Sequence, residues 1–554
     1  MAVYLFGPPE VTLSPQMPRQ GTFPGTDFMY FSDVFDISND LLASENVFDI
    51  SLVSDLPLFI DPFLVFDSDK PEYQRLHMDV VRYVSFVRNK IIEGNVTDAQ
   101  EKEWLHFKEI SNNWLGYSVG GNAGRGLGPT FASGALIGLR GPLKDFGKEK
   151  YSKGSHFERL FLFSKGAGKD ALSDFITNLC HEFLLNFTQV FARKHLAPEQ
   201  CREFNVRRVS FDYDKERWVH RKFFLPAFNS EYVLLTPIDL LTQSVPWINR
   251  PDLFDRFGGM LDAMSDIQLR QSVNDFLDQR LAPPPSHPRE KVFRPAKKDV
   301  QAAQERALEI YPELANWYVA LKEATGEEAV NQSRNRVARA DELYRSRVVE
   351  FLSSTLRPMG FFEIDVNDRQ TLLKTFANAI ERHGSELFVG EDGLVGDLSA
   401  DDVQLICTLV WCADGNRQRR PPQFRFVSDS RAASHFESGS QSNRDKTGMF
   451  VITTDRAKKS RIEFIVQNDN LEGIVVASIT GHGKENSTVE SIFISYTKAD
   501  ELWARWIGRV LLSAGYSVTV QFKDFLPGTN FVEQMDQAIK NGPSGFFVGE
   551  ALIR

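Results

Sequence analysis

SIFISYTKADELWARWIGRVLLSAGYSVTVQFKDFLPGTNF, residues 491–531, decides the fold of the C-terminal part of this chain. Short apolar runs typical of buried strands alternate in it with apolar residues at helical spacing. Strands and helices that alternate in this way imply a parallel sheet with right-handed crossovers. The predicted elements are strands at 491–496, 517–522 and 545–548, with helices at 501–514 and 531–540.

Ligands of such sheets bind in the crevice outside the carboxyl ends of the strands. In this sequence those ends are followed by the loops after Tyr496 and Phe522. The pattern therefore predicts an incomplete, flavodoxin-like α/β domain over residues 491–554, with its ligand loops at one edge of the sheet.

The residues of this stretch resemble the opening of the Toll/interleukin-1 receptor (TIR) family in its bacterial form. The matching features are the F-I-S-Y strand, an Asp shortly after it, a helix bearing tryptophan, the A-G-Y turn, and the D-F-x-P-G loop. The resemblance implies self-association, or association with other TIR proteins, in signalling. It also implies cleavage of NAD at the nicotinamide–ribose bond, often in antiphage defence.

Carried over by position, the family's nucleotide pocket involves an aromatic ring and backbone amides, which suit adenine and pyrophosphate. A rigid loop, or a contact with a neighbouring TIR domain, is an equally good interpretation of Phe525 and Pro527. NAD would be a substrate, and the sequence implies no bound cofactor and no metal. The matching pocket residues are Tyr496, Lys498, Asp500, Asp524, Phe525, Pro527 and Gly528.

The family's catalytic glutamate lies on a helix after the third strand, and its expected position falls beyond Arg554. Without a placed carboxylate, the positive charge that develops on the ribose lacks stabilisation. We therefore assign no catalytic residue, expect a truncated domain with little NAD cleavage, and leave open whether this chain is an enzyme. A non-catalytic TIR scaffold is the alternative function.

The rest of the chain is predicted to be a multidomain α+β body. Ala282-Pro-Pro-Pro-Ser-His-Pro288 is the clearest linker, and helical apolar spacing runs over residues 299–356. The predicted organisation is an α+β domain of unknown function at 1–281, a Pro-rich linker at 282–298, a helical segment at 299–360, an α+β region at 361–480, a second linker at 481–490 and the TIR domain at 491–554.

The body resembles conserved bacterial proteins of unknown activity, through stretches such as DLPLFIDPFLVF and YVLLTPIDLL. Relatives carry a nuclease-like region of the restriction-endonuclease type before the C-terminus. The matching stretches here, at 422–425 and 462–465, lack the Asp and Lys that would bind a metal and orient water. A degenerate nuclease-like region within 361–480 is thus a weaker alternative, and an ordinary strand pair explains the same residues.

Residues 157–163 are predicted to form a buried strand, followed by a glycine-rich turn and one long helix over 171–194. Such a turn before a helix N-terminus suits an anion, and Lys165 and Lys169 would assist. Asp170 and Asp174 favour the opposite interpretation, because acidic residues in the first turn repel a phosphate. A helix is also predicted over 72–92.

Composition excludes several classes of protein. The 554 residues carry a net charge of −10, so nucleic acid is an unlikely partner. The four cysteines form no CxxC pair, which favours buried thiols in a reducing compartment. No apolar run reaches the length of a membrane span, so we expect a cytoplasmic protein. Asp55, Asp61 and Asp67 are interpreted as turn and cap residues and not as metal ligands.

Overall fold

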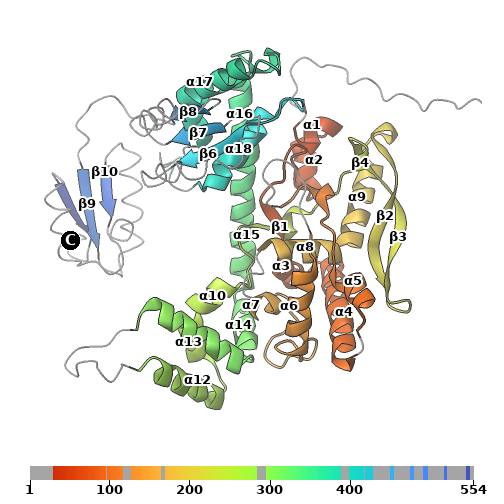
Figure 1. Ribbon diagram of the computed structural model, residues 1–554, viewed down its shortest axis with the longest axis vertical. Coiled ribbons are helices and arrows are strands. Elements are labelled where there is room, and N and C mark those ends of the chain that lie inside the picture. Colours follow the sequence, from red (N-terminus) through yellow and green to blue (C-terminus); the bar gives the residue numbers. More distant parts are fainter. Residues whose placement is uncertain are drawn as a thin grey trace, which may run out of the picture.

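The computed structural model describes most of the body and the strands of the C-terminal part (Figure 1). These residues form both helices and strands, so the predicted α+β class is confirmed. No helix among them is long and apolar enough to cross a membrane. The described residues are 29–94, 96–116, 126–163, 169–282, 295–388, 398–416, 418–427, 449–453, 474–478, 491–496, 517–520 and 544–548.

The first described segments form short elements that are held by caps. Asp61 accepts a hydrogen bond from the Phe63 N–H at the start of a helix, and the following proline suits the first helical position. This bond confirms the prediction of Asp61 as a cap residue, and its carboxylate also accepts the Trp247 N–H at 2.8 Å. The elements are α1 (Phe31–Phe35), α2 (Asn39–Ser44), β1 (Leu58–Ile60) and α3 (Pro62–Asp67).

A long amphipathic helix, α4 (Pro71–Glu93), confirms the helix predicted over 72–92. Its apolar positions recur every three or four residues and face the core, and it ends at Gly94 in the left-handed conformation. The elements that follow it are α5 (Asp98–Leu105), η1 (Ser111–Asn113) and α6 (Pro129–Arg140).

The strand predicted over residues 157–163 is wrong, because this run forms the short helix α7 (Arg159–Phe163). Periodicity does not separate a short buried helix from a buried strand, and tertiary packing decided the outcome here. The single helix predicted over 171–194 is two helices, α8 (Lys169–Leu179) and α9 (His181–His195). The strand–turn–helix geometry proposed for an anion is therefore absent at α7, while Lys165 lies outside the described residues.

An antiparallel hairpin packs against α9 (Figure 1). β2 (Cys201–Asp212) pairs with β3 (Arg217–Phe228), which pairs with β4 (Glu231–Tyr232). The register shifts between Val206 and Ser210, where Arg208 has φ +53°, so a bulge bends the strand. Nearby are η2 (Pro198–Gln200), η3 (Ile238–Leu240) and β5 (Leu241–Gln243), the last paired antiparallel with β1.

Five helices gather around a separate apolar core, into which Phe63 and Leu162 of the preceding segments also insert. Tyr318 is fully buried there, and its hydroxyl donates to Asp252 at 2.8 Å. The helices are α10 (Arg250–Asp255), α11 (Phe257–Ala263), α12 (Ile267–Arg280), α13 (Lys297–Ile310) and α14 (Leu314–Glu323).

A helical column then runs between the lower and upper parts of the molecule in Figure 1, as predicted for 299–356. It contains two π-helical turns, a feature that often marks functional or packing constraints. The column and the helices beyond it are α15 (Gly326–Asp341), the π turn η4 (Glu342–Ser346), α16 (Arg347–Phe351), the π turn η5 (Leu352–Leu356), η6 (Phe361–Glu363), α17 (Arg369–Phe388) and α18 (Ala400–Trp411).

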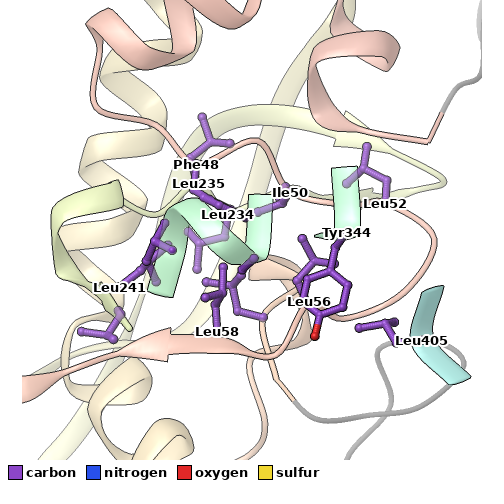
Figure 2. Close-up of a cluster of buried hydrophobic side chains, with 14 of the residues drawn as sticks. Phe48, Ile50, Leu52, Leu56, Leu58, Leu234, Leu235, Leu241, Tyr344 and Leu405 are labelled. Carbon is purple, nitrogen blue, oxygen red and sulfur yellow. The ribbon is translucent and has the colours of Figure 1, made fainter. Parts of the chain in front are cut away.

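The column shares one apolar core with the N-terminal part of the body. Figure 2 shows Tyr344 of the column beside Leu56, with Leu405 of α18 next to it. This core joins residues 29–241 to residues 337–452, although the helices of the second core lie between them in sequence. The predicted domain bounds stay a prediction, since packing in a common core does not define folding units.

Two three-stranded parallel sheets make up the C-terminal strands. In the first, the order follows the sequence, with α18 against β6 and α17 against β8. In the second, β9 is central and pairs in parallel with both neighbours. The strands are β6 (Gln423–Val427), β7 (Met449–Thr453), β8 (Ile474–Ser478), β9 (Ser491–Tyr496), β10 (Ser517–Val520) and β11 (Ser544–Val548).

Candidate functional site

The first candidate site is the edge of the C-terminal sheet at which its strands end. Tyr496, the last residue of β9, lies opposite Val548, the last residue of β11. Val520, the last residue of β10, lies opposite Ile494 of β9. Since all three strands run in the same direction, their carboxyl ends share one edge. The sheet therefore has Tyr496 on the side where ligands of parallel sheets bind.

The strand order β10-β9-β11 also puts a reversal of chain progression beside β9. The first strand lies in the middle, the second on one side and the third on the other, so the chain moves outward from β9 to β10 and then returns past β9 to β11. Such a switch point opens a crevice between the loops, where α/β proteins bind nucleotides. The other predicted pocket residues lie outside the described residues: Lys498, Asp500, Asp524, Phe525, Pro527 and Gly528.

A second arrangement, the His156 cluster, consists of His156, Glu158 and Glu323 and is buried within the body. The Nε2 atom of His156 lies 2.9 Å from Glu323 Oε1, and its Nδ1 atom lies 3.6 Å from Glu158 Oε1. The side chains of His156 and Glu323 are 1% and 2% exposed. The N–H groups of Lys153 and Gly154 also donate to Glu323, at 2.7 and 2.9 Å.

The electrostatics of the His156 cluster favour a protonated imidazole. Burial by itself lowers the pKa of His156, but hydrogen bonds and charge from Glu158 and Glu323 outweigh it and raise the pKa to about 9. Burial, followed by the charge on His156, lowers the pKa of the neighbouring His77 to about 4. At neutral pH His156 is therefore charged and His77 is neutral.

Aromatic rings enclose the cluster and separate it from water. The Phe66 ring stands edge-on to His156 at 4.4 Å between centroids, and the Phe63 ring is stacked at 5.9 Å. Lys322, the residue of α14 directly before Glu323, pairs with Asp252 at 2.9 Å and lies 3.6 Å from the Trp247 ring centre. A substrate cannot reach His156 through this packing, so the cluster serves to join α14 to α3 and the 149–159 segment.

Sequence analysis missed this cluster entirely. His156 and Glu323 are 167 positions apart, and neither belongs to a motif. Among the residues that the structure describes, no group of three His, Cys, Asp or Glu side chains could hold a metal ion. The predicted buried thiols are confirmed for Cys180, Cys201 and Cys407, whereas Cys412 is half-buried.

The cluster predicts how stability depends on pH. The pKa of His156 is about 9 in the folded chain and 6.5 in the unfolded one, so its contribution is complete below pH 6.5 and lost as the pH rises through 9. We expect the free energy of unfolding in urea to fall from pH 6.5 to pH 9, and to fall less in His156→Gln. The exposed His220→Gln variant should retain the wild-type decline. Equal declines in all three proteins would contradict the assignment.

Comparison with known families is informative at both ends of the chain. A family model of the TIR domain matches residues 492–548, from β9 through β11. A model described as a domain of unknown function (DUF8370) matches residues 36–249, which end immediately before α10. No curated protein and no solved structure matches the chain.

Proposed function

Because this chain carries a TIR domain at residues 492–548, joined to a DUF8370 domain at 36–249, we propose that it is a TIR-type signalling or effector protein of bacterial defence. Its TIR domains would associate with one another, or with those of other proteins, and cleave NAD. The parallel order β10-β9-β11 supports this proposal, since it brings the carboxyl ends of the strands and Tyr496 to one edge.

The proposed reaction is hydrolysis of NAD at the nicotinamide–ribose bond. The C–N bond breaks, nicotinamide leaves with the bonding electrons, and water adds to the ribose carbon, so that ADP-ribose and a proton are formed. Tyr496 and Phe525 would hold the adenine by stacking, and the amides of the 524–528 loop would face the pyrophosphate. Lys498 and Asp500 would line the same pocket. No catalytic carboxylate is assigned.

Assembly without catalysis is the second candidate function. Phe525 and Pro527 would suit a contact with a neighbouring TIR domain as well as a nucleotide, and TIR–TIR association alone can carry a signal. A nuclease-related body remains the weaker alternative: residues 423–425 of its first proposed stretch lie in β6, whereas 462–465 lie outside the described residues.

The test uses the purified full chain with NAD, and it measures released nicotinamide together with molecular mass in solution. Because no catalytic carboxylate is assigned, we expect only slow release, which should rise more steeply than protein concentration. Phe525→Ala should lower this slow release about tenfold, the effect of losing one stacked base. Leu526→Ala, at the variable position of the same loop, is the control and should stay near wild type.

Self-association without nicotinamide release would favour the scaffold and reject the enzyme. A chain that neither associates nor releases nicotinamide at any concentration would overturn both TIR proposals. Loss of plasmid DNA in the presence of Mg²⁺ would instead support a nuclease.

A further inference from the structure

An open groove of about 490 Å³ lies on the body between α4, the junction of α8 and α9, and the β2–β3 hairpin. This volume is in the range of ligand-binding clefts. Its floor is aromatic and apolar, because Leu76, Tyr83 and Trp218 are buried beneath it and Phe183 and Phe211 are half-buried along it.

One rim of the groove carries charges of alternating sign. Glu72, Arg75, Asp79 and Arg82 follow one another on α4 at spacings of three and four residues, which places them on one face. All four are exposed, and none forms an ion pair with another described residue. At 1.5 Å per residue, this row of charges extends over roughly 15 Å.

The opposite rim, formed by α9 and β3, carries charges that are already paired with each other. Glu182 of α9 and Arg221 of β3 form an ion pair across it. On the α4 rim, the Arg82 guanidinium lies 4.0 Å from the ring centre of Tyr213, which follows β2, so the ring positions this cation at the mouth of the groove. Stacking on a ring leaves the N–H groups at the edge of a guanidinium free to bind a carboxylate or a carbonyl oxygen.

These charges discriminate between classes of partner. The four charges along α4 sum to zero, so a nucleic acid would meet as many carboxylates as guanidinium groups and gain no net attraction. A purely apolar ligand would cover the aromatic floor but leave both rims unmatched. A polypeptide segment with an apolar side chain between an acidic and a basic residue matches the floor and both signs of charge.

We propose that this groove is the docking site of the body for an extended peptide segment of a partner protein. At about 3.3 Å per residue, the charged row accommodates roughly four or five residues of extended chain. The apolar side chain of the segment lies on Phe183 and Phe211, an acidic residue pairs with Arg82 and a basic residue pairs with Asp79. The site is distinct from the TIR domain and gives the body a binding role of its own.

The test begins with the full-length chain and a displayed library of random octapeptides. We expect the retained peptides to share an apolar residue with one acidic and one basic neighbour. For the best retained peptide, Arg82→Glu should weaken binding about tenfold, because attraction becomes repulsion at an exposed rim. Replacing the acidic residue of the peptide by lysine should restore binding to this variant.

Arg140→Glu is the matched control, since Arg140 is exposed on α6 and does not line the groove. The proposal is overturned if Arg82→Glu and Arg140→Glu bind the peptide alike, or if no peptide is retained. It is also overturned if an eight-nucleotide oligothymidine binds and depends on Arg82 in the same way. All substituted positions are on the surface, and unchanged thermal unfolding midpoints verify that each variant is folded.

Discussion

Replacing Glu323 with alanine should lower the free energy of unfolding by about 3–5 kcal/mol, because it removes the hydrogen-bonded carboxylate partner of a buried cation. Glu323 is the centre of the His156 cluster: His156 lies 2.9 Å from it, and two backbone N–H groups donate to it. The variant would retain the charged imidazole among apolar rings, with Glu158 at 3.6 Å as the remaining counter-charge. Urea unfolding at pH 6.5, followed by circular dichroism, measures the loss.

Two further variants distinguish the stability lost with the His156–Glu323 ion pair from the stability lost when any glutamate side chain is shortened. Glu327→Ala, at an exposed position in the first turn of the next helix, should cost no more than about 1 kcal/mol. His156→Ala combined with Glu323→Ala should be less destabilising than the sum of the single changes, because the two side chains interact directly. Additive losses, or a Glu323→Ala loss no larger than that of Glu327→Ala, would show that the pair does not hold α14 in place.

Replacing Tyr344 with alanine should also lower the free energy of unfolding by about 3–5 kcal/mol, the usual cost of removing a large buried ring. Tyr344 is fully buried in the core of Figure 2, where the helical column meets the N-terminal part of the body. Its backbone carbonyl accepts the Tyr30 hydroxyl, and its own hydroxyl donates to Asp402 at 2.5 Å. The change therefore loosens the contact between three distant segments.

Tyr344→Phe retains the ring and should cost only about 1 kcal/mol, since Asp402 is half-buried and keeps its hydrogen bonds from Ser399. Tyr151→Ala is the surface control: Tyr151 is 41% exposed and stacks on Trp317, a contact of about 1 kcal/mol. If Tyr344→Phe were as destabilising as Tyr344→Ala, the hydroxyl and not the packing would hold the column, contrary to this account.

Local pattern predicted the elements that are long or bounded by strong signals. The spacing of apolar residues located α4, and it located the helices of 299–356. The same rule failed at 157–163, where five apolar residues among seven are too few to separate a strand from the helix α7. The two π-helical turns, which contain the buried Tyr344 and Leu352, were not predicted, because the apolar spacing that indicates a helix does not distinguish a π turn from an α turn.

The sequence by itself determined the TIR domain, because strand, turn and loop residues that characterise it are contiguous within 492–548. Only the tertiary structure decided the His156 cluster, the joint core of residues 29–241 and 337–452, and the groove beside α4. Each of these brings together side chains that are far apart along the chain and belong to no local motif. Which of these side chains come into contact depends on how the folded chain packs. The local sequence around each residue does not specify its distant partners.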